Sequence, residues 1–140
     1  MVRTSILAAL ALASTAASAQ PRGNVQLPIA PGHYVWEGEP CGRAGSIFRY
    51  DGRRAGWYGA EAEGDMVGDI RRVRRAGSRY VVRVTGRDAE GEVQDGLIDL
   101  TVTLLGRGRI AAQLEAGPDS EVTPLRLCQP ASLPRWGRRF

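Results

Sequence analysis

Between residues 32 and 128 the chain consists of short runs in which apolar and polar side chains alternate, separated by turn-forming residues. The clearest run is Leu97–Leu105, where isoleucine, leucine and valine occupy every second position and aspartate and threonine lie between them. A period of two is that of a β-strand with one buried face. Gly106-Arg107-Gly108 then permits a three-residue hairpin loop with positive φ, and the alternation resumes over Arg109–Leu114.

Further runs of this kind indicate a chain built almost entirely of strands. Residues 66 to 75 are ambiguous, because Met66, Ile70 and Val73 have helical spacing. We favour a strand with a kink or bulge near Arg71-Arg72, since a hairpin loop and an extended run follow. Pro124 in the last run cannot donate a ladder hydrogen bond, which favours an edge or a bulge there. The remaining runs are residues 33–37, 46–51, 55–58, 79–85 and 121–128.

Two cysteines, Cys41 and Cys128, constrain how these strands are arranged. Cys41 follows the first strand and Cys128 ends the last one. In an exported chain an even cysteine count predicts a disulfide, and a disulfide requires the two Cα atoms to lie within about 7 Å. The sheet's ends must therefore meet. We predict an all-β fold, a single antiparallel up-and-down meander of seven to eight strands closed into a small barrel that resembles calycin-type barrels, with a two-sheet β-sandwich as the alternative.

The N-terminus has the features of a secretory signal peptide. Arg3 is followed by the apolar run Ile6–Leu12 and by Ala17-Ser18-Ala19, which predicts cleavage after Ala19 and a periplasmic or secreted protein. The apolar run is too short to span a membrane. The predicted organisation is a signal peptide (residues 1–19), an extended N-terminal arm (20–31), the barrel domain (32–128) and a basic C-terminal tail (129–140).

The charged residues argue against most enzyme classes. Every basic residue is an arginine and the net charge is +4, so Schiff-base and Ser-Lys chemistry have no lysine to use. His33 is the only histidine, and no serine lies in a nucleophile motif. The acidic segments around residues 61–69 and 88–95 match neither a calcium loop nor a defined carboxylate pair. We therefore predict no enzyme activity, no metal and no cofactor.

Arginine clustering is the strongest functional signal. Seven arginines within seventeen residues could bind an anionic partner, although Arg83 is expected opposite Asp99, where an ordinary cross-strand ion pair would form. The candidates for this site are Arg71, Arg72, Arg74, Arg75, Arg79, Arg83 and Arg87.

Aromatic residues form a second candidate set, either lining a ligand cavity at the barrel mouth or filling the core. They are Tyr34, Trp36, Phe48, Tyr50, Trp57 and Tyr80.

These observations predict a monomeric binding or interaction module whose partner is an anionic envelope component or an envelope protein. Two alternatives are an inhibitor of an envelope hydrolase that presents the loop Asp88–Gly96, and a carrier of small apolar ligands. The export signal disfavours nucleic acid. A membrane-spanning barrel is not expected, because Arg138 and Arg139 break the alternation before Phe140.

Overall fold

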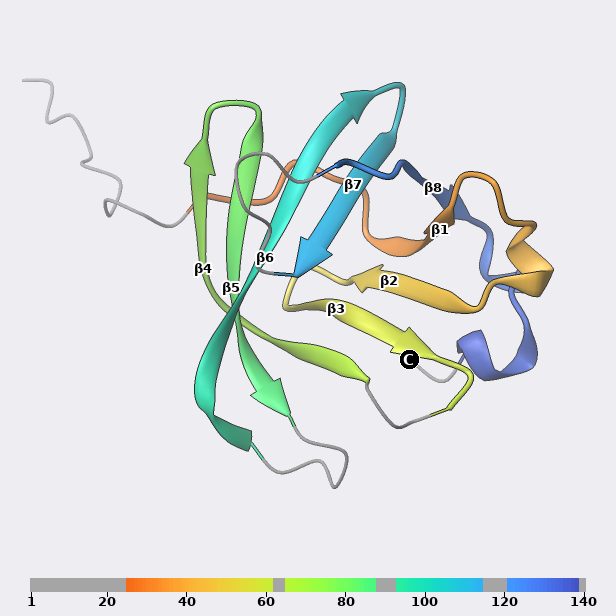
Figure 1. The fold of residues 1–140 in the computed structure, drawn as a ribbon, viewed down its shortest axis with the longest axis horizontal. Helices are drawn as coiled ribbons and strands as arrows, with labels where there is room; N and C mark the ends of the chain where they lie inside the picture. The colour runs from red at the N-terminus through yellow and green to blue at the C-terminus, as the bar shows by residue number, and fades with distance from the viewer. Residues whose placement is uncertain (1–24, 62–64, 88–92, 115–120, 139–140) are drawn as a thin grey trace, which may run out of the picture.

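A computed structural model describes residues 25–61, 65–87, 93–114 and 121–138, and its eight antiparallel strands form one closed barrel (Figure 1). Consecutive strands are neighbours around the barrel, so the predicted up-and-down barrel is confirmed over the two-sheet sandwich. Within the described ranges, no helix has the length and apolar character needed to cross a membrane. The strands are β1 (Gly32–Trp36), β2 (Ser46–Tyr50), β3 (Arg54–Gly59), β4 (Met66–Ala76), β5 (Arg79–Arg87), β6 (Val93–Gly106), β7 (Arg109–Leu114) and β8 (Leu125–Cys128).

The barrel closes where the first strand pairs with the last. β1 and β8 are antiparallel, with Tyr34 opposite Leu127 and Trp36 opposite Leu125. β8 begins at Leu125, so the prediction of a strand from residue 121 was wrong for its first four residues. Proline has no N–H for a sheet ladder, so a strand start directly after Pro124 is physically expected. Its carbonyl still accepts a hydrogen bond from the Glu37 backbone at 3.0 Å.

A disulfide between Cys41 and Cys128 connects the two ends of the meander, as predicted. Their Cα atoms lie 5.9 Å apart and the bond spans 87 residues of sequence. Cys41 begins the 3-10 helix η1 (Cys41–Arg43), which links β1 to β2. Arg126 on β8 strengthens this junction, because its guanidinium donates to the Glu39 carbonyl at 2.7 Å and lies 3.1 Å from the Cys41 Sγ.

Replacing both cysteines by serine should lower the free energy of unfolding by about 2–5 kcal/mol, since the bond restricts a long loop in the unfolded chain. Urea unfolding of the oxidised protein and of the Cys41→Ser/Cys128→Ser variant measures this loss. Reduced wild-type protein is the control and should unfold like the variant. Two free thiols in the denatured, unreduced wild type would contradict the bond itself.

Two long hairpins, β4–β5 and β6–β7, extend the barrel wall at one end (Figure 1). The register of β4 against β5 shifts between Ile70 and Arg72, which confirms the predicted kink or bulge at this point. Gly68 lies so close to β5 that a Cβ atom there would be 1.8 Å from the Thr85 carbonyl oxygen, and only glycine permits this approach. β6 already begins at Val93, so the polar loop predicted over residues 88–96 is shorter than expected.

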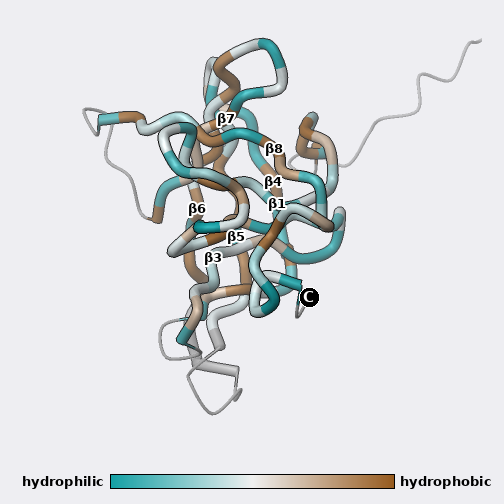
Figure 2. Tube along the Cα trace, turned by 90° about the vertical axis from the view of Figure 1, so that its right-hand side faces the viewer, coloured by the Kyte–Doolittle hydropathy of each residue, from teal (hydrophilic) through white to brown (hydrophobic). Residues whose placement is uncertain are grey.

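The barrel interior is filled by apolar side chains from every strand, as the alternation of apolar and polar positions along the strands suggests (Figure 2). Leu27, in the segment predicted to be an extended arm, is 2% exposed and belongs to the same core cluster. The backbone N–H of Val25 also donates to the Val73 carbonyl on β4 at 3.2 Å. Residues 25–31 therefore pack on the barrel and contribute to its core.

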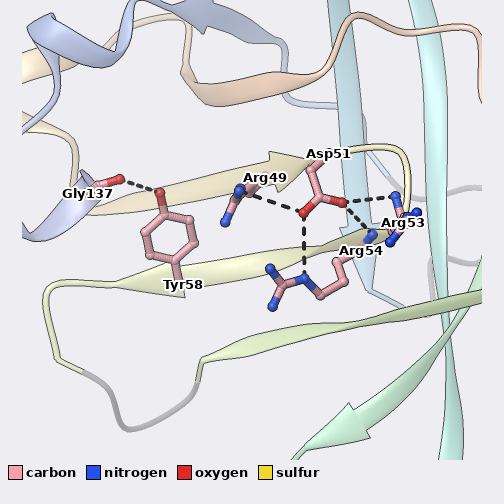
Figure 3. Close-up of polar contacts among 6 residues, drawn as sticks. All are labelled: Arg49, Asp51, Arg53, Arg54, Tyr58 and Gly137. Atoms are coloured by element: carbon pink, nitrogen blue, oxygen red, sulfur yellow. Dashed lines mark hydrogen bonds and ion pairs between the residues drawn. The ribbon is translucent and has the colours of Figure 1, made fainter. Parts of the chain in front are cut away.

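A second, smaller core lies beneath the C-terminal segment. This segment forms the 3-10 helices η2 (Pro130–Ser132) and η3 (Arg135–Arg138), and Leu133 is buried against β1 and β2 residues. The Tyr58 hydroxyl donates to the Gly137 carbonyl at 2.6 Å (Figure 3), and its ring meets Trp136 edge-on at a centroid distance of 5.9 Å. The residues predicted as a basic tail are thus packed on the barrel up to residue 138.

The β2–β3 turn is organised by one carboxylate, that of Asp51 (Figure 3). Its Oδ1 accepts backbone hydrogen bonds from Arg53 at 2.9 Å and Arg54 at 2.7 Å, and its Oδ2 lies 3.7 Å from the Arg49 guanidinium. Burial alone would raise the pKa of Asp51, but the two backbone hydrogen bonds and the neighbouring guanidiniums outweigh it. The pKa of Asp51 is therefore lowered, and folding favours its ionised form.

Asp51→Ala should cost about 1–2 kcal/mol at pH 7, because hydrogen bonds to a charged group are lost. A lowered pKa means that this contribution is present above the unfolded value of about 3.9 and disappears as the pH falls through the folded value. Urea unfolding at a series of pH values between 7 and 2 tests both points. Asp51→Asn keeps an acceptor without the titrating charge, so it should lose less stability at pH 7 than Asp51→Ala but the same part of the pH dependence. An equal loss in wild type and Asp51→Ala on acidification would contradict the assignment.

Candidate functional site

The outward surface of β4, β5 and β6 carries the candidate site, which we call the arginine face and define as Arg72, Arg74, Val81, Arg83 and Asp99. These residues are brought together by strand register: Arg72 lies opposite Arg83, Arg74 opposite Val81, and Arg83 opposite Asp99. The intervening residues, such as Val73 and Val82, point into the barrel core. Alternation along the strands therefore places these three arginines on one side of the wall.

Arg83 and Asp99 form a bidentate ion pair on this face. Arg83 Nε lies 2.9 Å from Asp99 Oδ1, and its second guanidinium nitrogen lies 3.1 Å from Oδ2. The hydrogen bond from Arg83 lowers the pKa of Asp99, and the charge of Arg74 acts in the same direction. The predicted cross-strand pair is confirmed, and it fixes the Arg83 guanidinium in one orientation.

The arginine face encloses a shallow cavity of about 180 Å³ lined by its five residues. Arg72 and Arg74 are exposed, and within the described part of the chain Arg74 forms no salt bridge. Three guanidinium groups thus surround one carboxylate. Guanidinium groups match the geometry of phosphate oxygens, so this cavity has the charge and the donors required for a phosphate-sized anion.

The other predicted arginines take different positions. Arg71 lines a separate cavity of about 580 Å³ beside the N-terminal arm, together with Arg53 and Asp69. Arg75 donates through Nε to the Gly77 carbonyl at the hairpin turn, at 3.1 Å. Arg79 is half-buried opposite Thr103. The side chain of Arg87 is outside the described part of the structure.

The aromatic candidates lie in or against the core. Four of them, Tyr34, Phe48, Tyr50 and Tyr80, are buried in the main cluster. Trp36 and Trp57 are partly buried and stack on each other with ring centroids 4.9 Å apart. These rings contribute to the packed barrel interior. Tyr34 also lines a cavity of about 440 Å³, and Tyr50 lines the cavity of about 580 Å³.

Where the structure describes them, the remaining chemical candidates form no assembled centre. His33 lies on β1 opposite Cys128, and Asp65 accepts a hydrogen bond from the Gly59 backbone at 3.1 Å. Among the described residues, no three histidine, cysteine or acidic side chains are grouped as metal ligands. Most of the proposed inhibitor loop, residues 88–92, lies outside the described residues, and Asp95 is part of β6.

One cavity was not predicted from the sequence. It lies between the arm, the β6–β7 turn and β8, has a volume of about 440 Å³, and includes Arg107, Arg109 and Arg126 in its lining. Of its lining residues, Tyr34 was among the aromatic candidates named from the sequence, and Arg107 lies between two glycines in a loop that needs positive φ. Comparisons of the chain with protein-family models, with curated proteins and with solved structures found no match.

Proposed function

We propose that this protein is an exported binding module whose arginine face holds a phosphate-bearing anionic component of the cell envelope. The observation that supports this most directly is the cluster of three arginines around one aspartate in a phosphate-sized cavity. The face stands on three paired strands over a filled core, and the Asp99 pair holds the Arg83 guanidinium in place before any ligand arrives. Preorganised donors bind with less loss of side-chain entropy.

Export is part of the proposal and has two supports. The first nineteen residues have the composition of a secretory signal, and a disulfide is stable in oxidising compartments outside the cytosol. The disulfide also occupies both cysteines, so neither thiol is available as a nucleophile. With one histidine and no lysine in the chain, we propose binding and not catalysis as its role.

Inorganic polyphosphate is a suitable probe, because it presents phosphate without lipid or protein. We expect binding at low salt that weakens as salt rises, since condensed counterions are released. Replacing Arg72 and Arg74 by serine should lower the affinity at least about tenfold, because two charge-assisted hydrogen bonds are lost. It should also flatten the dependence of log K on log salt, by about one for each lost phosphate contact.

Arg43→Ser/Arg135→Ser is the matched control for charge. Both residues are exposed and lie on the 3-10 helices η1 and η3, outside the arginine face. This variant therefore loses the same net charge as Arg72→Ser/Arg74→Ser but keeps the arginine face intact. Fluorescence titration or calorimetry of the two double variants compares them. Equal losses in both would reduce the effect to net charge, and an absence of wild-type binding at low salt would overturn the proposal.

Asp99→Asn should act in the opposite direction and strengthen polyphosphate binding about two- to fivefold at low salt, the range expected for one exposed charge. The change removes the single carboxylate of the face while keeping its shape. The gain should disappear at high salt, where exposed charges are screened. Weaker binding by Asp99→Asn would instead mean that the orientation of Arg83 matters more than the added charge.

A further inference from the structure

The cavity between the arm, the β6–β7 turn and β8, which we call the hairpin cavity, is separate from the arginine face. Its volume of about 440 Å³ is within the range of roughly 300–1,000 Å³ typical of small-molecule sites. Ile29, Leu104, Ile110 and Leu127 contribute apolar surface to it. The cavity is therefore large enough for a small organic molecule, and too small for a folded partner.

Two of the apolar lining residues are exposed to an unusual degree for their size. Leu104 is 38% exposed and Leu127 is 45% exposed, although both come from strands of the barrel wall. Ile110, next to them, is 2% exposed and forms the floor. Covering apolar side chains that are open to water around a concave site lowers the free energy of the complex, so an apolar group is favoured there.

The three arginines of the hairpin cavity differ in their partners. Arg126 is held by the Glu39 carbonyl and the disulfide sulfurs, and Arg109 forms an ion pair with Glu37 at 3.1 Å. Arg107 has no ion pair or side-chain hydrogen bond with any described residue. In this part of the structure the cavity thus has an apolar floor and one available cation at its edge.

The backbone at Arg107 is also unusual. Arg107 has φ +53° and is the only residue other than glycine with positive φ among the described residues. Gly106 pairs with Arg109, so the predicted three-residue loop was one residue too long, and Arg107 and Gly108 (φ +72°) form a two-residue turn. Glycine or asparagine is preferred at both positions of such a turn. An arginine here costs stability, and such strained positions are concentrated at sites where the side chain has a function.

We propose that the hairpin cavity binds a single-chain amphiphile with one anionic head group, such as a medium-chain carboxylate. The apolar chain would cover Leu104 and Leu127 over the Ile110 floor, and the head group would pair with Arg107. Charge complementarity selects the anion, because the cavity lining contains three arginines and no acidic residue. This inference is independent of the function proposed for the arginine face.

Decanoate, used below its micelle concentration, tests the proposal against decanol, which has the same chain length without the charge. Calorimetric titration of the full chain should give saturable binding of decanoate at one site. The affinity for decanoate should exceed that for decanol by about two- to fivefold at low salt, as expected for one exposed ion pair. Arg107→Gly should reduce the decanoate affinity by a similar factor, while Arg107→Lys should retain most of it.

Arg107→Gly should also raise the melting temperature by a few degrees, about 3–6 °C, because glycine adopts positive φ without strain. If Arg107→Gly is more stable and yet binds decanoate more weakly, the Arg107 side chain serves binding, because replacing a structural side chain would lower stability. The Arg72→Ser/Arg74→Ser variant is the control and should bind decanoate normally.

Three results would overturn the proposal: no decanoate binding, equal affinity for decanoate and decanol, or unchanged decanoate affinity in Arg107→Gly. If decanoate fails but a short apolar peptide with a free carboxyl terminus binds, the cavity would belong to a chain end and not to an amphiphile.

Discussion

Closure of the sheet is the constraint on which the other features of this protein depend. β1 must pair with β8, and only four residues of β8 are available for this. The Cys41–Cys128 bond and the Arg126 guanidinium hold the same junction from the side, so hydrogen bonds, a covalent link and a charged donor act together. An open sheet would expose two edges and its apolar face, whereas the closed barrel has neither.

Once the barrel is closed, its interior and its surface have separate roles. The interior is occupied by side chains from every strand, together with Leu27 from the arm. The proposed binding sites consequently lie on the outer wall and at the barrel end beside the two long hairpins. There the arginines differ sharply in their roles: Arg126 and Arg83 are held by carbonyl or carboxylate partners, whereas Arg74 and Arg107 present donors to solvent. The same residue type therefore serves both stability and the proposed binding.

The sequence predicted much of the fold and part of the site. Alternation identified the strands, including the bulge at Arg71-Arg72, and the cysteine positions favoured a closed barrel. Register between neighbouring long strands even predicted the Arg83–Asp99 pair. Grouping seven arginines together was less informative, because neighbours in sequence point to opposite sides of a strand. Only the pairing of strands showed that Arg72, Arg74 and Arg83 share a cavity while Arg75 and Arg71 do not.

By itself, the sequence determined the period of each strand and the positions of the turns, because these depend on neighbours within a few residues. It also determined which cysteines could form a bond, because the chain has only two. The tertiary structure alone decided where residues 25–31 and 129–138 pack and which of the described arginines form ion pairs. Leu27 and Leu133 lie in segments with no period, and their burial depends on surfaces formed by distant strands. The hairpin cavity likewise combines three segments that are far apart along the chain, so no local pattern could have indicated it.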